Sequence, residues 1–500
     1  MKYKWNSKRA DDSITKSCQQ VEEINIIPYT KEKKLNKIKV NEAYEMNAVH
    51  MYIDILNLKD MLTNSSDNEN ITSHTRTLRF FDSHFKAIKF VINDTESIFV
   101  DFHNQRLHTV IAKPYDDEKK RLDRAVTIAK VIIDVVEQQR QLGNDDIIDA
   151  AKLRIGIDSG LALAVNNGRR SNKEPLFLGN PANYAAKHSA GELQGIYLTK
   201  NAREVLELQG VEDTQTIKLK SSEIDASLER SNIDHENLIN RTINEIKDHT
   251  KKLSDFAFSR LTPTFESLDF SVFTRKNSKR LEMVSIYADI DGFTKYISEN
   301  IGTVEGQKDI VRCLHVLRAE MDACLTNDFQ GRRVRFIGDC IHGILCEGTS
   351  QTTNKQVSVD TALEAAAGIR SSFILSKELL EEKFNITANF GLAIGLDFGE
   401  TMLSRVGRLD ENTRFSLGLS TISSEEEQMR CASDETAIAE EAYSHLSQKY
   451  KDLFTDRITK NLNFEILEET EQNEVENNKK SNIYSINEAA SSNLKAHAKS

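Results

Sequence analysis

The sequence predicts an α+β fold, an α/β sandwich with helices on a mixed sheet, that occurs twice in tandem along the chain. Three pairs of similar segments predict the duplication, and the members of the pairs lie 239, 235 and 234 positions apart. Such close agreement at a large spacing indicates a duplicated domain and not a short-period repeat. The pairs are RIGIDSG with AIGLDFG (Gly156 and Gly395), MYIDIL with VSIYADI (Asp54 and Asp289), and SIFVDFHNQRLHTVIA with GRRVRFIGDCIHGILC (Gln105 and Asp339).

Each copy has the same order of expected elements: a strand, a helix, a hairpin, a long helix and a further strand. Apolar residues recur at helical spacing over 119–142 and over 360–384, and β-branched runs flank both stretches. Between the copies, the polar stretch 221–256 carries apolar residues at helical spacing, which predicts a connecting helix or helical hairpin. The expected organisation is an N-terminal extension (1–40), a first domain (41–210), a helical connector (211–279), a second domain (280–465) and a polar, disordered tail (466–500).

The composition excludes several classes of protein. The 500 residues are 39% hydrophobic and 29% charged, and no apolar run is long enough to span a membrane. A net charge of −11 argues against a stable nucleic-acid partner, which normally needs a basic face. The basic N-terminus is followed by no apolar segment, so it is no secretory signal, and the six cysteines show no metal-ligand spacing. We therefore expect a cytoplasmic protein with reduced thiols.

The string YADIDGFT (287–294) is the first candidate for chemistry, and it follows the apolar run LEMVSI, which is typical of a buried strand. Asp289, at the end of that strand, can hold a divalent cation with help from the backbone carbonyl of Ile290. The turn expected at Gly292 would free backbone N–H groups to bind phosphates. Those groups belong to Gly292, Phe293 and Thr294. The alternative is a solvated Asp-Gly turn; an EF-hand loop would need its glycine two places later.

The string FIGDC (336–340) is the second candidate, and its expected hairpin places Asp339 beside the strand that carries Asp289. Carboxylates from two neighbouring strands can hold two divalent ions. One ion would activate a ribose 3′-oxygen, and the other would neutralise a triphosphate and its leaving pyrophosphate.

YADIDGFT and RFIGD at this spacing resemble the metal-binding motifs of the class III nucleotidyl cyclases, the adenylate and guanylate cyclase family. The resemblance covers roughly 41–207 and 280–454, whereas the GG[DE]EF signature of diguanylate cyclases is absent. It implies a nucleoside triphosphate substrate, two Mn²⁺ or Mg²⁺ ions, and active sites between two domains that face each other head to tail. In this family one domain supplies the metal-binding aspartates and the other supplies an asparagine and an arginine.

The two copies divide these residues between them. The first copy carries FLGNPANYAAKHSAG (177–191), similar to the family's GxxxNxAxR segment, so the resemblance implies that Asn183 orients the ribose and Lys187 stabilises the transition-state phosphate. Lysine keeps the charge of the family's arginine but loses its bidentate fork. The alternative is that both are ordinary polar residues on one helical face.

Each copy lacks what the other retains. The second copy has Ile422 and Glu426 at the asparagine and arginine positions, and the first has Gln105 where Asp339 stands. One complete site is therefore expected, in a pseudo-heterodimer within one polypeptide that needs no partner chain for catalysis. The second site, at Asp54, is expected to be degenerate.

The residues expected to read the base are unlike those of purine cyclases. The family's lysine in the hairpin corresponds to Asp101, and its polar residue seven before the asparagine corresponds to Leu176. If Asp101 faces the pocket, it can accept from the exocyclic amine of cytosine; a one-residue change of register would turn it to solvent. The substitutions resemble the pyrimidine cyclases of bacterial Pycsar antiphage systems, which implies CTP or UTP as substrate and a separate effector protein that reads the cyclic product.

The sequence thus predicts a cytidylate cyclase that converts CTP to 3′,5′-cyclic CMP as a second messenger in antiphage defence. A uridylate cyclase and a purine cyclase are the enzymatic alternatives. The alternative from another class is a silent, cyclase-like module that binds a nucleotide. Retention of Asp289 and Asp339 together with Asn183 and Lys187 argues against silence.

Overall fold

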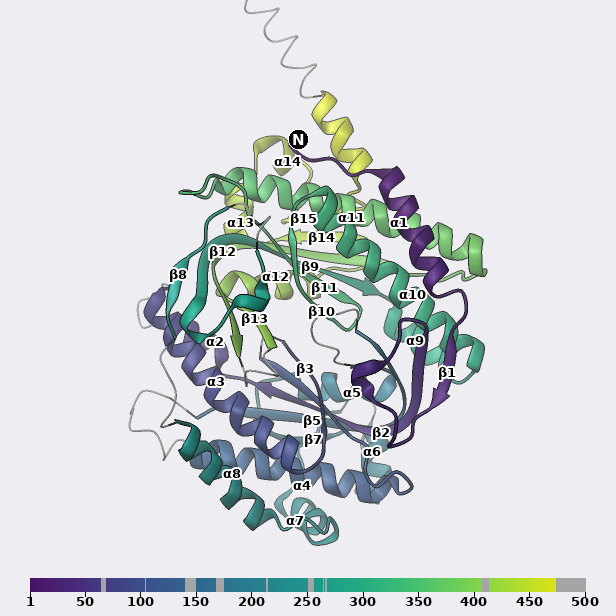
Figure 1. Ribbon diagram of the computed structural model, residues 1–500, viewed down its shortest axis with the longest axis vertical. Helices are drawn as coiled ribbons and strands as arrows, with labels where there is room; N and C mark the ends of the chain where they lie inside the picture. The colour runs from purple at the N-terminus through teal and green to yellow at the C-terminus, as the bar shows by residue number, and fades with distance from the viewer. Residues whose placement is uncertain are drawn as a thin grey trace, which may run out of the picture.

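The fold is known from a computed structural model of the chain. It describes residues 1–63, 69–103, 105–139, 150–167, 175–212, 215–250, 256–263, 265, 268–406 and 413–473. Two sheets with helices on their outer sides make up the molecule, one sheet for each predicted copy (Figure 1). No helix among these residues is long and apolar enough to cross a membrane.

The first copy is built on a seven-stranded sheet in the order β3-β4-β2-β5-β6, with β1 paired to β2 and β7 to β5. Its strands are β1 (Asn25–Pro28), β2 (Glu42–Ile55), β3 (Ile98–His103), β4 (Arg106–Ile111), β5 (Leu153–Asn166), β6 (Pro175–Leu178) and β7 (Gly195–Leu198). Its helices are α2 (Leu58–Leu62), α3 (Ile71–Asp94), α4 (Glu118–Gln139), α5 (Asn180–Ser189) and α6 (Lys200–Val205).

The second copy is built on an eight-stranded sheet in the order β10-β11-β9-β12-β14-β15, with β13 paired to β12 and β8 to β9. Its strands are β8 (Phe258–Arg260), β9 (Ser278–Asp291), β10 (Arg332–Ile337), β11 (Cys340–Leu345), β12 (Gly391–Val406), β13 (Thr413–Leu417), β14 (Glu435–Ile438) and β15 (Ile458–Lys460). Its helices are α9 (Phe293–Asn300), α10 (Val304–Ala323), α11 (Lys355–Phe384), α12 (Leu419–Met429), α13 (Glu440–His445) and α14 (Gln448–Lys451).

Equivalent positions in the two sheets make equivalent contacts, which confirms the duplication. A tyrosine stacks on a histidine of the neighbouring strand in both copies, with ring centroids 4.2 Å apart for Tyr52 and His108 and 4.3 Å apart for Tyr287 and His342. The repeated glycines have a steric cause. A Cβ on Gly156 would lie 2.1 Å from a carbonyl oxygen of α5, and one on Gly395 would lie 2.2 Å from a carbonyl oxygen of α12.

The two copies exchange apolar side chains, so neither core is complete alone. Leu176 and Leu178 of β6 belong to the hydrophobic cluster formed largely by the second copy. In return, Phe415 and Leu417 of β13 belong to the cluster of the first copy. Each copy thus inserts one β-hairpin arm into the other, as the expected head-to-tail pseudo-heterodimer requires.

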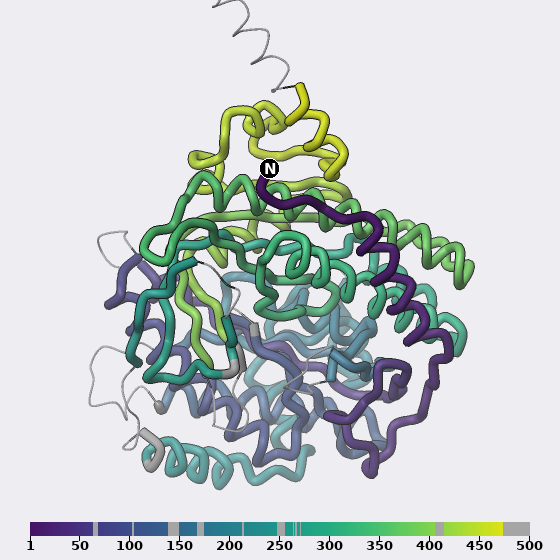
Figure 2. Tube along the Cα trace, turned by 45° about the horizontal axis from the view of Figure 1, so that its top comes forward, coloured from purple at the N-terminus to yellow at the C-terminus, as the bar shows by residue number. Residues whose placement is uncertain are grey.

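The predicted N-terminal extension is part of this packing. Helix α1 (Ser7–Gln20) buries Ala10, Ile14 and Cys18 in the cluster of the second copy, and β1 then pairs with β2 of the first. Figure 2 shows the purple N-terminal segment running along the green helices of the second copy. The segment therefore joins the two copies, because the periodic apolar face of α1 has a core to cover.

The other predicted boundaries also shift at their edges. The connector holds α7 (Ser221–Arg230) and α8 (His235–Thr250), and its last part supplies β8 to the second sheet. Residues 464–473 are helical, so 466–473 of the predicted tail are ordered, because Phe464 and Leu467 pack into the core. The rest of that tail, 474–500, lies outside the described residues.

Candidate active site

Strand β9 presents Asp289 on the face of the sheet turned away from the core helices. Ile286, Ala288 and Ile290 alternate with it and are buried in the apolar cluster. After the strand the chain turns at Gly292, whose φ of +85° lies in the left-handed region that glycine favours. The expected turn is therefore present, and α9 begins directly after it.

The start of α9 is held in place by its first side chain. The ring of Phe293 is 1% exposed and meets Phe390 edge-on, with centroids 5.4 Å apart. The Phe293 side chain therefore anchors the helix, whereas Thr294 is exposed at the surface. Helix N-termini carry backbone N–H groups without intrahelical partners, which suits an anionic ligand.

Asp339 lies in the turn between β10 and β11, as the sequence predicts. Gly338 makes the turn with a φ of +60°. The register of β11 on β9 sets Ile341 opposite Ala288, which brings the turn to the end of β9 beside Asp289.

The two aspartates are close enough to perturb each other. Burial, and then the charges of Asp291 and Glu425, raise the pKa of Asp289 to about 6. Burial, and then the charge of Asp289, raise the pKa of Asp339 well above its ordinary value, although the charge of Arg318 opposes this rise. In the part of the chain that the structure describes, no lysine, arginine or histidine forms an ion pair with either carboxylate. A partly buried pair of acids without an ion-pair partner is a costly arrangement unless a cation binds there.

These residues fit divalent metal ions. Paired carboxylates offer the hard oxygen ligands that Mg²⁺ and Mn²⁺ prefer. Within the described residues there is no cluster of three or more His, Cys, Asp or Glu side chains that could hold a metal alone. Asp289 and Asp339 would therefore share the ions with a backbone carbonyl, such as that of Ile290, and with phosphate oxygens of a substrate.

Helix α5 of the first copy, which carries Asn183 and Lys187, contacts α9 of the second copy. The Asn180 side-chain amide donates to the Ser298 hydroxyl of α9 over 3.1 Å, so α5 lies against the helix that follows Asp289 (Figure 1). The Nδ2 of Asn183 is buried and has no hydrogen-bond partner among the described residues, whereas Lys187 is exposed. Buried amides are nearly always bonded, so the Asn183 amide is a candidate ligand contact.

Asp101 does not point to solvent, because its side chain is only 12% exposed beside Arg335 of the second copy. The Oδ1 of Asp101 lies 3.4 Å from Nη1 of Arg335 and accepts the backbone N–H of Phe102. Sequence reasoning missed Arg335. The repeat offset of 234 positions, which relates Gln105 to Asp339, also relates Asp101 to Arg335, and that signal could have found it.

Leu176 is 8% exposed, lies opposite Val165 in the β5–β6 pair, and packs with the apolar cluster of the second copy. The Leu176 side chain has no polar atom, so it could contact a base only through apolar surface.

The equivalent position in the first copy, which we call the Asp54 site, is filled by a cation of the chain itself. Nε of Arg106 donates to Oδ2 of Asp54 over 2.9 Å, and Gln105 also bonds to this carboxylate. Burial raises the pKa of Asp54, and Arg106 counteracts that rise. The residues border a cavity of about 300 Å³. Arg106 follows Gln105 directly in the sequence and was overlooked there.

Glutamates of the second copy lie near the Asp54 site, since the charge of Glu425 helps to raise the pKa of Arg106. Glu426 pairs with Lys59 over 3.0 Å. Glu69 of the first copy accepts the backbone N–H of Leu419 at the start of α12.

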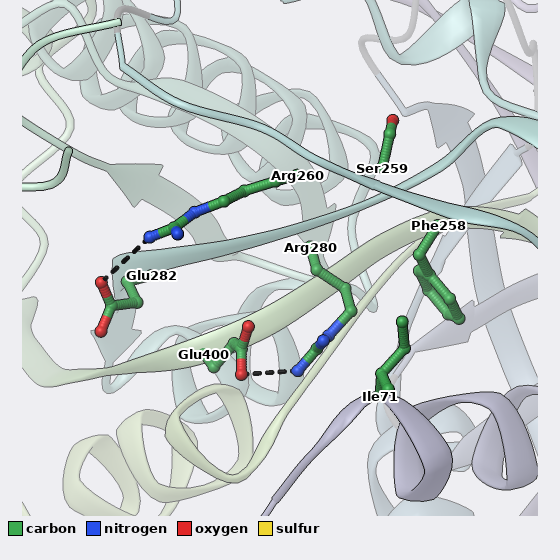
Figure 3. A pocket seen from close by; sticks show the side chains of 7 residues that line it. All are labelled: Ile71, Phe258, Ser259, Arg260, Arg280, Glu282 and Glu400. Carbon is green, nitrogen blue, oxygen red and sulfur yellow. Dashed lines mark hydrogen bonds and ion pairs between the residues drawn. The ribbon is translucent and has the colours of Figure 1, made fainter. Parts of the chain in front are cut away.

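A polar chain continues from Glu69 toward the surface. Glu69 accepts from Nε2 of His74 over 2.6 Å, His74 accepts from Arg280 over 3.0 Å, and Arg280 pairs with Glu400. Arg280 and Glu400 line a cavity of about 390 Å³, which Figure 3 shows with a second pair, Arg260 and Glu282. The chain of contacts joins the two copies on the side of the Asp54 site.

The chain is similar over most of its length to known proteins. It is 44% identical over 461 residues to a protein of Pseudomonas aeruginosa named uridylate cyclase, which covers 91% of this chain and 88% of that protein. A uridylate cyclase of a Rhizobium species is 35% identical over 431 residues, 83% of this chain and 81% of that protein. No family model matches the chain.

One solved structure matches almost the whole fold. It is described as a class III adenylyl cyclase-like ATP-binding protein from Pseudomonas aeruginosa. The match has a TM-score of 0.89 and 43% identity, and it covers 94% of this chain and 100% of that one. With its paired aspartates, its head-to-tail copies and these relatives, the chain belongs to the class III nucleotidyl cyclase family, alongside the two uridylate cyclases.

Proposed function

We propose that this protein is a pyrimidine nucleotide cyclase that converts UTP to 3′,5′-cyclic UMP and pyrophosphate. In this reaction the ribose 3′-oxygen forms a bond to the α-phosphorus, the bond to the β-phosphate oxygen breaks, and the 3′-hydroxyl proton is released. The observation that carries the proposal is the pair of partly buried carboxylates, Asp289 and Asp339, whose pKa values are raised by burial and by neighbouring acids. The names of the two relatives support it.

Asp289, Asp339 and the carbonyl of Ile290 would hold two divalent ions, Mn²⁺ or Mg²⁺. Bound there, the ions supply Lewis-acid activation of the 3′-oxygen and neutralise the pyrophosphate. The backbone N–H groups at Gly292, Phe293 and Thr294 would bind the triphosphate, because they sit at a helix N-terminus directly after Asp289.

Asn183 and Lys187 would act from the first copy. The partnerless Nδ2 of Asn183 can donate to a ribose oxygen and orient the sugar for in-line attack. The exposed ammonium of Lys187 can move to the phosphoryl oxygens on which negative charge develops in the transition state. Because both copies lie in one chain, a monomer would suffice for catalysis.

The choice of UTP over CTP rests on the pair of Asp101 with Arg335. Asp101 alone would favour the amine of cytosine, but Arg335 already occupies one of its oxygens. A guanidinium has N–H donors and no acceptor, so Arg335 brings donor groups and a positive charge beside Asp101. At position 4 uracil presents a carbonyl acceptor where cytosine presents an amine donor, so a guanidinium there would suit uracil better. Leu176 would form the apolar wall of the same pocket.

The test is to incubate the purified chain with each of the four nucleoside triphosphates and Mn²⁺, and to identify cyclic products by mass spectrometry. We expect cyclic UMP as the main product. Cyclic CMP as the main product would overturn the argument from Arg335 and restore the cytidylate cyclase. A cyclic purine nucleotide would overturn the assignment to pyrimidines. Binding of nucleotide without any cyclic product would favour the silent module.

A pair of variants sharpens the assignment of the base. Arg335→Gln removes the positive charge, and we expect the preference for UTP over CTP to fall by about tenfold, the equivalent of one charged hydrogen bond. Arg332→Gln, on the same strand, is the matched control and should leave the preference unchanged, because Arg332 is bonded to the backbone of Gly331. We further propose that a separate effector protein reads the product.

A further inference from the structure

Arg318 of α10 is a buried arginine that reaches from the second copy into the first. Its side chain is 4% exposed. Nη2 donates to both oxygens of Asn167, the backbone carbonyl at 3.1 Å and Oδ1 at 2.8 Å. Asn167 is 3% exposed and directly follows β5, in the arm that the first copy inserts into the second. A buried charge is thus bound by the tip of the other copy's arm.

The same guanidinium also contacts the hairpin that carries Asp339. Its Cζ lies 3.8 Å from the ring centroid of Phe336, at the end of β10. Phe336 is 3% exposed and stands three residues before Asp339, opposite Ile341 in the hairpin. Arg318 is therefore in contact with the inserted arm and with the support of one of the two site aspartates.

We propose that Arg318 is a positioning residue that fixes the Asp339 hairpin relative to the first copy. By bonding to Asn167 and stacking on Phe336, it sets the separation of Asp339 from Asp289 and from the residues of α5. The carboxylate pair takes its metal-holding geometry when the arm is docked. This inference rests on the proposed function.

The planar guanidinium suits this task better than an ammonium would. It can stack on an aromatic ring with its face and donate hydrogen bonds with its edge at the same time. Its burial also makes the arrangement rigid, because leaving the charge without its partners would be costly. A displacement of about 1 Å in a reacting group can cost about 10²-fold in rate, so small changes at Arg318 reach the chemistry.

Arg333 offers a matched control on the same ring. Its Cζ lies 4.2 Å from the centroid of Phe336, but its guanidinium pairs with Asp322 of α10, within the second copy. Arg333 thus shares the stacking contact with Arg318, while its ion pair joins two elements of the same copy.

The activity test compares Arg318→Met, Arg318→Lys, Asn167→Ala and Arg333→Met in the full chain, with UTP and a titration of Mn²⁺. We expect Arg318→Met to lower kcat by about 10²-fold and to raise the Mn²⁺ concentration needed for half-maximal rate, with KM for UTP nearly unchanged. Arg318→Lys should restore part of kcat, because it keeps one donor. Arg333→Met should stay within about threefold of the parent, the range expected when no bond to the site is lost.

The link between Arg318 and Asn167 is tested by a double-mutant cycle. Asn167→Ala removes one of the two bonds and should cost about tenfold. The double variant that combines Arg318→Met with Asn167→Ala should lose about 10²-fold in kcat, as Arg318→Met does alone, because the bond that Asn167→Ala removes is already absent. Multiplied losses, or equal losses from Arg318→Met and Arg333→Met, would overturn the proposal.

A readout without catalysis separates this proposal from the proposed function. In metal-free protein, Arg318→Met should speed hydrogen exchange of the amides in 332–345, whereas Arg333→Met should not. It should also weaken binding of Mn²⁺ measured by electron paramagnetic resonance. If the parent makes no cyclic nucleotide, the proposed function fails while both measurements still test Arg318. Unchanged exchange and unchanged Mn²⁺ binding in Arg318→Met would overturn the positioning role.

Discussion

The Asp289 site and the Asp54 site occupy the same place in two copies of one fold. In each, an aspartate is shielded from water, but the charged groups around the two aspartates differ. Asp54 is buried and lies 2.9 Å from the guanidinium of Arg106. Asp289 is also withdrawn from water, but its neighbours are further acids, and its pKa rises to about 6. The charge of Asp54 is balanced by the chain itself, and the charge of Asp289 would be balanced by the proposed metal ions.

The difference comes from two adjacent positions in each hairpin. The first copy has Gln105 and Arg106 where the second has Asp339 and Cys340. Exchanging an acid for an amide and a thiol for a guanidinium would convert the proposed metal site into an internal ion pair.

The largest expected effect tests the difference between the Asp289 site and the Asp54 site directly. Asp289→Asn or Asp339→Asn should lower the rate of cyclic nucleotide formation by at least about 10³-fold, because several kcal/mol of transition-state stabilisation depend on the metal ions. Asp54→Asn should leave most of the rate. Product formation at saturating Mn²⁺ is the measurement, and an equal loss from Asp54→Asn would show that the active site has been assigned to the wrong copy.

A second comparison uses the residues that face each site. Lys187→Ala should lower kcat by about 10²-fold, since it removes a charge that stabilises the transition state. Glu426→Ala changes the equivalent residue across the Asp54 site, which pairs with Lys59 at the surface. It should leave kcat within about twofold, because exposed ion pairs contribute below about 1 kcal/mol. Initial rates of both variants test the assignment, which similar losses would contradict.

The third prediction concerns pH at low Mn²⁺ concentration. A metal ion binds the ionised carboxylates, and the pKa of Asp289 in the metal-free protein is raised to about 6 by burial and by neighbouring acids. The rate should therefore fall as the pH drops through about 6, by about tenfold per pH unit when metal binding is limiting. Saturating Mn²⁺ should move this limb to lower pH. If the fall in rate at low pH did not depend on the Mn²⁺ concentration, another titrating group would be responsible for it.

The smallest expected effect is on the stability of the metal-free protein, where Asp289→Asn and Asp54→Asn should change the free energy of unfolding in opposite directions. An aspartate whose pKa is raised on folding stabilises the fold below its unfolded pKa, and this contribution is lost as the pH rises through its folded pKa. At pH 7.5 with a chelator, Asp289→Asn should therefore raise the free energy of unfolding by about 1–3 kcal/mol. The pKa of Asp54 is raised as well, but Asp54→Asn also leaves the guanidinium of Arg106 without its carboxylate, so it should lower the free energy of unfolding by about 1–3 kcal/mol. Denaturant midpoints of the two variants provide the test, and shifts of the same sign would argue against it.

Local patterns in the sequence were enough to predict the duplication and the motif of the Asp289 site. Repeated strings at a constant offset place Asp289, Asp339 and Gln105 without any coordinates, because residues that must end a buried strand or form a tight turn leave a local pattern. The turn at Gly292 and the helix after it follow from the same local rules.

What these residues contact depends on how the two copies pack. Three contacts illustrate this dependence. Arg106 pairs with Asp54 across neighbouring strands. Between the copies, Arg335 pairs with Asp101, and Arg318 joins Asn167 to the Asp339 hairpin. No local pattern encodes them, because the partners lie far apart in space until both copies have folded and their side chains can meet. The same holds for α1, whose apolar face packs on the core of the copy that lies last in the sequence.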